Sequence, residues 1–203
     1  IWQFGTKLPD TFLQVNPVEG GPPSQVTEIY LMRDSRNFYV GFRCLDTEPE
    51  GIRANQLKRD GDFDSDDAVS VVIDPFRDKR TGYIFKMTAA GARKDGRITG
   101  GRKADYNWDG IWYGRTAIDE NGWTCEMAIP FQTILADDTT GTWGFNFERF
   151  IRRNNETIRW TSARRDIGVT SVANADVVDG FGGLDIGQGI DVRPFVKGSL
   201  TDN

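Results

Sequence analysis

The sequence contains no histidine among its 203 residues. Histidine is the commonest general base of enzymes and the commonest protein ligand of transition metals, so both kinds of chemistry lose their usual residue. The sequence also shows no nucleophile placed beside a base that could activate it. We therefore expect a non-catalytic protein.

Positive charge, long apolar runs and cysteine are scarce as well. The formal net charge is −5 at pH 7, which disfavours a nucleic-acid partner. No apolar run approaches the roughly 20 residues of a membrane-spanning helix, so we do not expect this chain to cross a membrane itself. The two cysteines, Cys44 and Cys125, belong to no motif and stand in apolar alternations. We expect both to be buried packing residues; the alternative, a disulfide between them, requires their strands to be neighbours.

Runs in which apolar residues occupy every second position are the main positive signal. They cover residues 38–44, 69–73, 83–87, 123–131 and 143–147. A period of two, bounded by Gly, Asp, Asn and Pro, is typical of antiparallel strands, and no stretch shows a helical stripe over three turns. The sequence predicts an all-β fold, an antiparallel two-sheet β-sandwich, over residues 1–190. Residues 191–203 read as an exit strand that leads to a further C-terminal domain.

The stretch "DFDSDD", residues 62–67, crowds four carboxylates into six positions. It lacks the glycine and the bidentate acid that an EF-hand loop needs at fixed positions. Because closely spaced carboxylates repel one another, a looser calcium site is one interpretation, with Asp62, Asp64 and Asp66 as its ligands. The alternatives are a catalytic carboxylate pair and a solvated loop in which Asp66 or Asp67 caps turn amides.

Residues 148–166 contain six arginines and no lysine. Arginine suits bidentate contacts to carboxylates and stacking on aromatic rings. If the apolar alternation faces the core, Arg149 points inward. With Asn154 and Asn155 as a two-residue hairpin loop, Trp160 lies opposite Arg149 and offers it a cation–π surface. The arginines of this stretch either neutralise the acidic loop within the sandwich or contribute to a ligand site.

The strand that carries Arg149 also has an outward face, on which polar and aromatic residues are mixed: Asn146, Glu148, Phe150 and Arg152. A loop rich in Gly and Asp, residues 106–114, adds two tryptophans, which are either core residues or ligand platforms. Stacked aromatic rings with flanking carboxylates and amides suit carbohydrate, whose ring faces are apolar and whose rims carry hydroxyls. The candidate ligand residues are Trp108, Asp109, Trp112, Asn146, Glu148, Arg152 and Trp160.

Four segments resemble, in the same order, the strands of family-nine carbohydrate-binding modules and the related DOMON-like sandwiches. They are "LMRDSRNFYVGFRCLDTEP", "SDDAVSVVIDPF", "GWTCEMAIPF" and "WGFNFERFIRRNNETIRW". "FLQVNPVEGGPPSQVTEI" and "IDVRPFVKG" look like the first and last segments of a bacterial family that carries such a module ahead of a C-terminal outer-membrane-type β-barrel. The resemblance covers nearly the whole chain.

This resemblance implies a jelly-roll or immunoglobulin-like sandwich that binds a poly- or oligosaccharide as an accessory module. It places the protein on the periplasmic or cell-surface side of a bacterial outer membrane, with the β-barrel domain of the same chain as its partner. The alternative is a structural domain that docks on that barrel without sugar affinity, through a surface near residues 190–200.

In the sugar-binding members of the family, two aromatic side chains sandwich a sugar ring, helped by an acid and a base on neighbouring strands. The first aromatic position falls here on Asp64, next to Phe63, and the acid position falls on Ser70. The base position falls on Lys86, which joins the candidate ligand residues. The second aromatic should follow Trp160, but residues 164–178 contain no Phe, Tyr or Trp. The resemblance thus implies a different sugar site, built from the tryptophans and arginines, and the arginines favour an acidic glycan.

Overall fold

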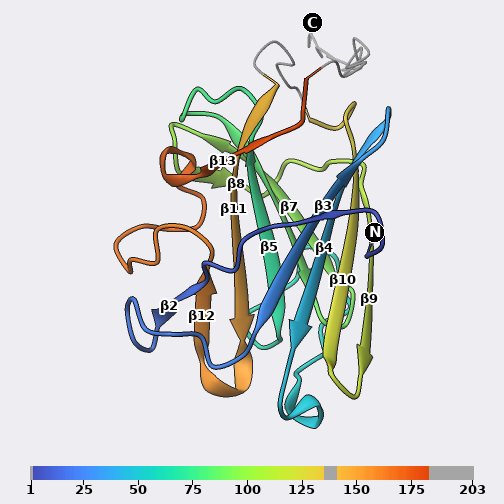
Figure 1. The fold of residues 1–203 in the computed structure, drawn as a ribbon, viewed down its shortest axis with the longest axis vertical. Helices are drawn as coiled ribbons and strands as arrows, with labels where there is room; N and C mark the ends of the chain where they lie inside the picture. Colours follow the sequence, from blue (N-terminus) through green and yellow to red (C-terminus); the bar gives the residue numbers. More distant parts are fainter. Residues whose placement is uncertain (1, 135–140, 183–203) are drawn as a thin grey trace, which may run out of the picture.

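The computed structural model describes residues 2–134 and 141–182, and these residues form a two-layer antiparallel β-sandwich. Figure 1 shows the two layers side by side, with β5 and β11 in one and β3, β4 and β10 in the other. The smaller sheet has the order β1 (Thr6–Lys7), β3 (Thr27–Arg33), β4 (Asn37–Leu45), β10 (Gly122–Pro130) and β9 (Tyr113–Asp119).

The larger sheet carries the functional features described below. Its order is β2 (Leu13–Asn16), β12 (Glu156–Arg159), β11 (Thr142–Ile151), β5 (Ala68–Asp74), β6 (Gly82–Thr88), β7 (Arg93–Thr99) and β8 (Lys103–Asp105). A last strand, β13 (Asp176–Asp179), pairs with β11. The short 3-10 helices are η1 (Pro49–Gly51), η2 (Arg152–Asn154) and η3 (Val172–Asn174). The all-β prediction is confirmed.

The core forms where the alternating runs of the two sheets face each other. On β11 the rings of Phe145 and Phe147 stack in parallel with centroids 6.0 Å apart, and both side chains are fully buried. Phe38 and Phe42 of β4 meet these two rings from the smaller sheet, at 5.3 and 5.9 Å. Alternation in the sequence therefore identified the inward face correctly, because side chains of a strand point to opposite faces in turn.

The outer face of the larger sheet is divided into a covered end and an open end. Val72, Ile84 and Ile98 point outward on β5, β6 and β7, where Val169 and Val172 pack over them. This segment shields the end of the sheet toward β8 and β13. The opposite end, beside η2, keeps an open hollow.

The β11–β12 hairpin differs from its predicted register. Ile151 pairs with Glu156 and Arg149 pairs with Ile158, whereas the sequence predicted a two-residue loop that pairs Arg149 with Trp160. That prediction is wrong because η2 takes up the chain between the strands and Asn155 closes the turn in the left-handed region, at φ 48°. Asparagine tolerates that conformation well.

The remaining predictions on chain organisation have mixed outcomes. Cys44 and Cys125 are both buried and free, as expected for packing residues. None of the helices in the described part of the chain has the length and apolar character that crossing a membrane requires. The boundary predicted at residue 190 and the exit strand at 191–203 lie outside the described residues.

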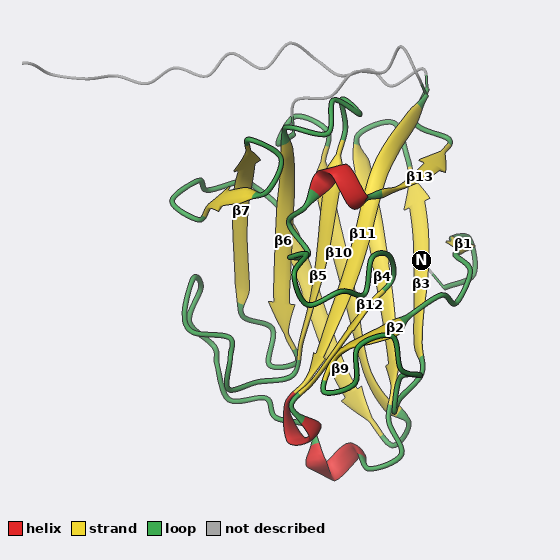
Figure 2. Ribbon diagram, turned by 90° about the vertical axis from the view of Figure 1, so that its left-hand side faces the viewer, coloured by secondary structure: helices red, strands yellow, loops and turns green. Residues whose placement is uncertain are grey.

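Figure 2 shows two of the short helices together at one end of the sandwich. They are η1 and η2. Gly51 of η1 lies so near Arg153 of η2 that a Cβ atom added to the glycine would be 2.9 Å from Cδ of the arginine. This end of the sandwich is the one that holds the hollow.

Candidate functional site

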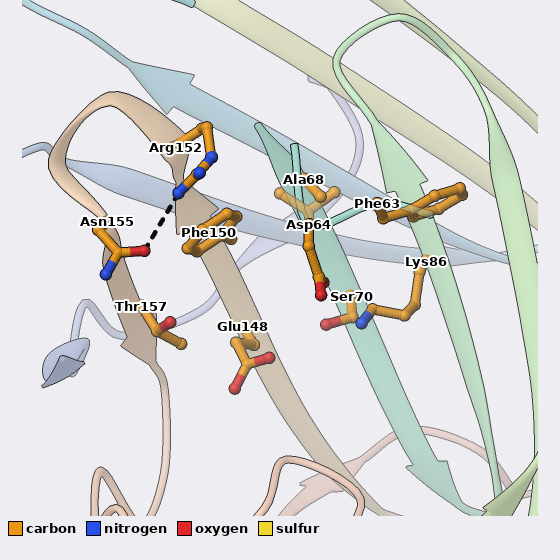
Figure 3. Close-up of a pocket in the computed structure, with 11 residues that line it drawn as sticks. Phe63, Asp64, Ala68, Ser70, Lys86, Glu148, Phe150, Arg152, Asn155 and Thr157 are labelled. Atoms are coloured by element: carbon orange, nitrogen blue, oxygen red, sulfur yellow. Dashed lines mark hydrogen bonds between the residues drawn. The ribbon is translucent and has the colours of Figure 1, made fainter. Parts of the chain in front are cut away.

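A hollow of about 380 Å³ opens on the outer face of the larger sheet, and we call it the outer-face pocket. Its volume lies within the range of small-ligand sites. The loop before β5, the strands β5, β6, β11 and β12, and the turn around η2 contribute its walls (Figure 3). The lining residues are Phe63, Asp64, Ala68, Val69, Ser70, Lys86, Glu148, Phe150, Arg152, Asn155 and Thr157.

A row of polar side chains crosses the floor of the pocket at right angles to the strands. The strand register places Arg159 opposite Glu148, Glu148 opposite Ser70, Ser70 opposite Lys86, and Lys86 opposite Lys94. Residues directly opposite each other in antiparallel strands share a face of the sheet, so all five belong to the outer face. The pocket floor is therefore polar and charged, although the other side of the same strands is an aromatic core.

Two phenylalanines flank this polar floor. Figure 3 shows Phe63 and Phe150 on opposite sides of the pocket, with the carboxylate of Asp64 between them. The guanidinium of Arg152 lies 5.9 Å from the Phe150 ring centroid, and Nζ of Lys94 lies 5.9 Å from that of Phe63. Aromatic walls above hydrogen-bonding groups suit a ligand with an apolar face and a polar rim.

Glu148 is fixed by an ion pair with Arg159. Nη2 and Nε of Arg159 lie 2.6 and 3.0 Å from the same oxygen, Oε2 of Glu148. Arg159 is almost fully buried and also donates to the carbonyl oxygens of Ser162 and Ile167. Such charge-assisted contacts restrict the Glu148 side chain. Both contacts use Oε2, so Oε1 keeps its capacity to accept a further hydrogen bond.

A second cluster of charges, buried inside the sandwich, anchors the η2 turn. Asp46 accepts two hydrogen bonds from Arg153, Nη1 to Oδ2 at 2.6 Å and Nη2 to Oδ1 at 2.7 Å. Arg149 lies behind this pair, with Nη2 3.5 Å from Oδ2 of Asp46. Burial acts to raise the pKa of Asp46, but the hydrogen bonds from Arg153 and from the amide of Glu48, together with the charges of Arg153 and Arg149, hold the pKa below its usual value. Because Arg153 is clamped, Arg152 and Asn155 on the same turn are positioned at the pocket.

The acidic stretch serves mainly to cap the loop before β5. Asp66 is buried and accepts hydrogen bonds from the backbone amides of Asn55 and Gln56, both at 2.6 Å, while Oδ1 of Asp62 accepts from the amide of Asp64 at 2.9 Å. Within the described ranges no three acidic or cysteine side chains are grouped so that they could hold a metal ion. Asp62, Asp64 and Asp66 therefore do not assemble into the predicted calcium site, because backbone amides occupy the Asp66 carboxylate. The carboxylate of Asp64 lines the pocket instead.

Three of the eight predicted ligand residues meet in the pocket, namely Lys86, Glu148 and Arg152. The sequence indicated Glu148 and Arg152 because they alternate with residues that face the core, and it indicated Lys86 through the family resemblance. The same outward phase holds for Phe150, which the candidate set left out. Phe63 was noted only as the neighbour of Asp64.

The other five predicted ligand residues lie elsewhere. Trp112 is 1% exposed and packs edge-on against Phe85, and Trp160 is 6% exposed and donates from Nε1 to a backbone carbonyl oxygen. Asn146 is buried and binds the backbone of Thr161. The structure assigns these three to the core and its edges, and none of them is among the residues that line the outer-face pocket.

Trp108 and Asp109 lie in the loop before β9 and outside the pocket. The Trp108 ring is half-buried and packs on Tyr83 with centroids 5.1 Å apart. Asp109 is exposed and accepts from Nη2 of Arg59 at 3.1 Å. Of the two interpretations of the tryptophan loop, packing against the core is the one that the contacts support.

The comparisons with known proteins agree with this fold. The family model described as carbohydrate family 9 binding domain-like matches residues 6–176. A carbohydrate-binding module of family 9 from Caldicellulosiruptor kristjanssonii, solved with cellotriose, has a TM-score of 0.61 at 14% identity, covering 95% of this chain and 90% of its own. The same organism's family 9 module, solved with glucose, has a TM-score of 0.60, also at 14% identity and over the same shares of both chains.

A third similar structure is a candidate carbohydrate-binding protein from Bacteroides uniformis. Its TM-score is 0.64 at 14% identity, over 84% of this chain and 86% of that chain. No match was found among curated proteins. The resemblance to family-nine modules is confirmed, while the association with a C-terminal β-barrel stays a prediction. This chain belongs to the carbohydrate family 9 binding domain-like family.

Proposed function

We propose that this domain binds carbohydrate, without transforming it, in the outer-face pocket. The observation that carries the proposal is the arrangement of Phe63 and Phe150 on opposite sides of a polar floor formed by Ser70, Lys86 and Glu148 (Figure 3). A sugar ring over this floor would present an apolar face to the partly exposed Phe150 and its hydroxyls to the floor, while the buried Phe63 closes the opposite wall. Membership of a family of binding domains supports the same assignment.

The pocket also contains three positions that correspond to the sugar site of the family's sugar-binding members, namely Asp64, Ser70 and Lys86. Ser70 and Lys86, which stand at the acid and base positions of the sugar-binding members, face each other on β5 and β6. The aromatic partner absent from residues 164–178 has a counterpart in Phe150 of β11, which reaches the pocket from a different element. The aromatic pair is thus formed by other positions of the chain.

Binding of oligosaccharides to the domain, with and without the Phe150 ring, tests the proposal. We expect calorimetric titration of a panel that starts from glucose and cello-oligosaccharides to find at least one ligand. Phe150→Ala should weaken it by about tenfold to a hundredfold, since a stacked aromatic contributes on the order of 1–3 kcal/mol to such contacts. Tyr113→Ala removes an exposed aromatic from the other sheet, where Tyr113 is 62% exposed, and should leave the affinity unchanged. Equal losses in both variants, or none in either, would refute the pocket assignment.

We further propose that the module acts at the bacterial envelope, on the periplasmic or surface side of the outer membrane, beside a β-barrel domain of the same chain. This rests on the resemblance of the first and last segments alone. Fractionation of cells that express the full-length protein tests it, and recovery of the protein in the cytoplasm would contradict it.

A further inference from the structure

Lys86 and Lys94 lie directly opposite each other on β6 and β7, on the pocket face of the sheet. Like charges in this position destabilise a sheet unless something neutralises them. Nζ of Lys94 donates to the carbonyl oxygen of Gly61 at 3.3 Å and lies over the rings of Phe63 and Tyr106. Among the residues that the structure describes, no carboxylate forms an ion pair with either lysine.

The carboxylates around the pocket do not offset this positive charge. Glu148 is already neutralised by Arg159, whose Nη2 lies 2.6 Å from it. Arg152 contributes a further cation, and its polar contact is to the neutral side chain of Asn155, at 3.2 Å. Asp64 is the one lining carboxylate left without an ion pair in the described ranges. With Lys94 and Arg159 counted beside the lining residues, four cations stand against the two carboxylates of Asp64 and Glu148, although the whole chain has a formal net charge of −5.

We propose that the pocket selects a sugar that carries a carboxylate, namely a uronic-acid residue of an oligosaccharide. This inference rests on the proposed function and adds the chemical class of its ligand. The carboxylate would pair with Lys86, with Lys94 beside it, and thereby remove the repulsion between the two lysines. Asp64 and the free oxygen of Glu148 would accept hydrogen bonds from sugar hydroxyls. The lysines would thus bind the carboxylate of the ligand, and the acidic residues its hydroxyls. The arginines of residues 148–166 mostly serve the scaffold, and lysine provides the selectivity.

The experiment compares oligogalacturonates with their fully methyl-esterified forms, which keep the ring and lose the charge. Calorimetric titration at low salt should give an affinity about tenfold higher for the acid than for the ester, the equivalent of one good charge-assisted contact. The ratio should fall as salt is added, because the pocket is open to solvent and its charges are screened.

Lys86→Gln should bring the ratio of acid to ester close to one. Its melting temperature should be no lower than that of the natural protein, since the substitution also removes the repulsion with Lys94. An unchanged melting temperature would show that the loss of binding does not come from a loss of folding. Lys103→Gln, an exposed lysine on β8 outside the pocket, is the matched control and should keep the full ratio.

These results distinguish a failure of the uronic-acid selectivity from a failure of carbohydrate binding. Equal affinity for acid and ester, or an unchanged ratio in Lys86→Gln, would overturn the selectivity while neutral oligosaccharides still bind. If neither charged nor neutral oligosaccharides bind the folded domain, carbohydrate binding itself is refuted.

Discussion

Replacing Asp46 with asparagine tests the buried charge cluster that positions the η2 turn beside the pocket. The side chains of Asp46 and Arg149 are fully buried, and that of Arg153 is 12% exposed. The neutral amide would remove the carboxylate that, within the described residues, forms the ion pairs of both guanidinium groups. Removing one partner of a buried ion pair typically costs about 3–5 kcal/mol, because the remaining charge stays desolvated. We expect a loss of that size in the free energy of unfolding, measured by urea titration of tryptophan fluorescence.

An exposed ion pair of similar geometry provides the control. Arg164 donates to both oxygens of Asp166, at 2.9 and 2.6 Å, but both side chains are more than 60% exposed. Asp166→Asn should hardly change the urea midpoint, since exposed pairs contribute little. A loss below about 1 kcal/mol in Asp46→Asn, the range of exposed pairs, would refute the reasoning that burial makes this cluster costly to break.

The loss of stability in Asp46→Asn should itself depend on pH. The pKa of Asp46 is lower in the folded than in the unfolded chain, despite its burial, because Arg153 hydrogen-bonds to the charged form. The Asp46 carboxylate therefore stabilises the fold fully above its unfolded pKa, about 3.9, and this contribution is lost as the pH falls through the folded pKa. The deficit of Asp46→Asn should be constant from neutral pH to about pH 5 and should shrink below about pH 4. A deficit that grows on acidification would contradict the direction of the shift.

Three further outcomes are expected from other buried contacts. Arg159→Met should lower the free energy of unfolding by about 3 kcal/mol, since it strands the partly buried carboxylate of Glu148; a loss below about 1 kcal/mol in urea titration would contradict the pair. Asp66→Asn should cost about 2 kcal/mol equally in calcium and in chelator, because backbone amides bind the carboxylate, and a calcium-dependent melting temperature would contradict this. Cys44 and Cys125 should not react with a thiol reagent until the protein unfolds, since burial raises the pKa of Cys44 to about 12 and that of Cys125 well above its usual value; rapid labelling of the native protein would argue against the packing.

The β-sandwich could be predicted because each strand shows its alternating apolar residues within a short stretch of sequence. Phe38 and Phe42, or Phe145 and Phe147, show the inward face of their strands by spacing alone. The hairpin register could not be obtained in this way, because it depends on a distant contact. Asp46 clamps Arg153, and the chain around Arg153 forms a 3-10 turn in place of a two-residue loop.

The site was predictable only in part, for a similar reason. Lys86 and Glu148 point outward by the phase of their strands, so sequence could place them on the outer face. The meeting of Phe63 and Phe150 depends on β5 pairing with β11, strands that are far apart in the sequence. The ring of Trp112 lies in a loop, where no periodicity shows which way a side chain points, and composition alone made it look like a ligand platform.

Chemical-shift mapping of the isotope-labelled domain, titrated with an oligosaccharide that it binds, tests carbohydrate binding in the outer-face pocket most directly. We expect the largest changes in the backbone amides of Ser70, Lys86 and Phe150, with β9 and β10 of the other sheet unaffected. Changes centred on the loop of residues 106–114, or on the smaller sheet, would show that the ligand binds elsewhere and would contradict this assignment.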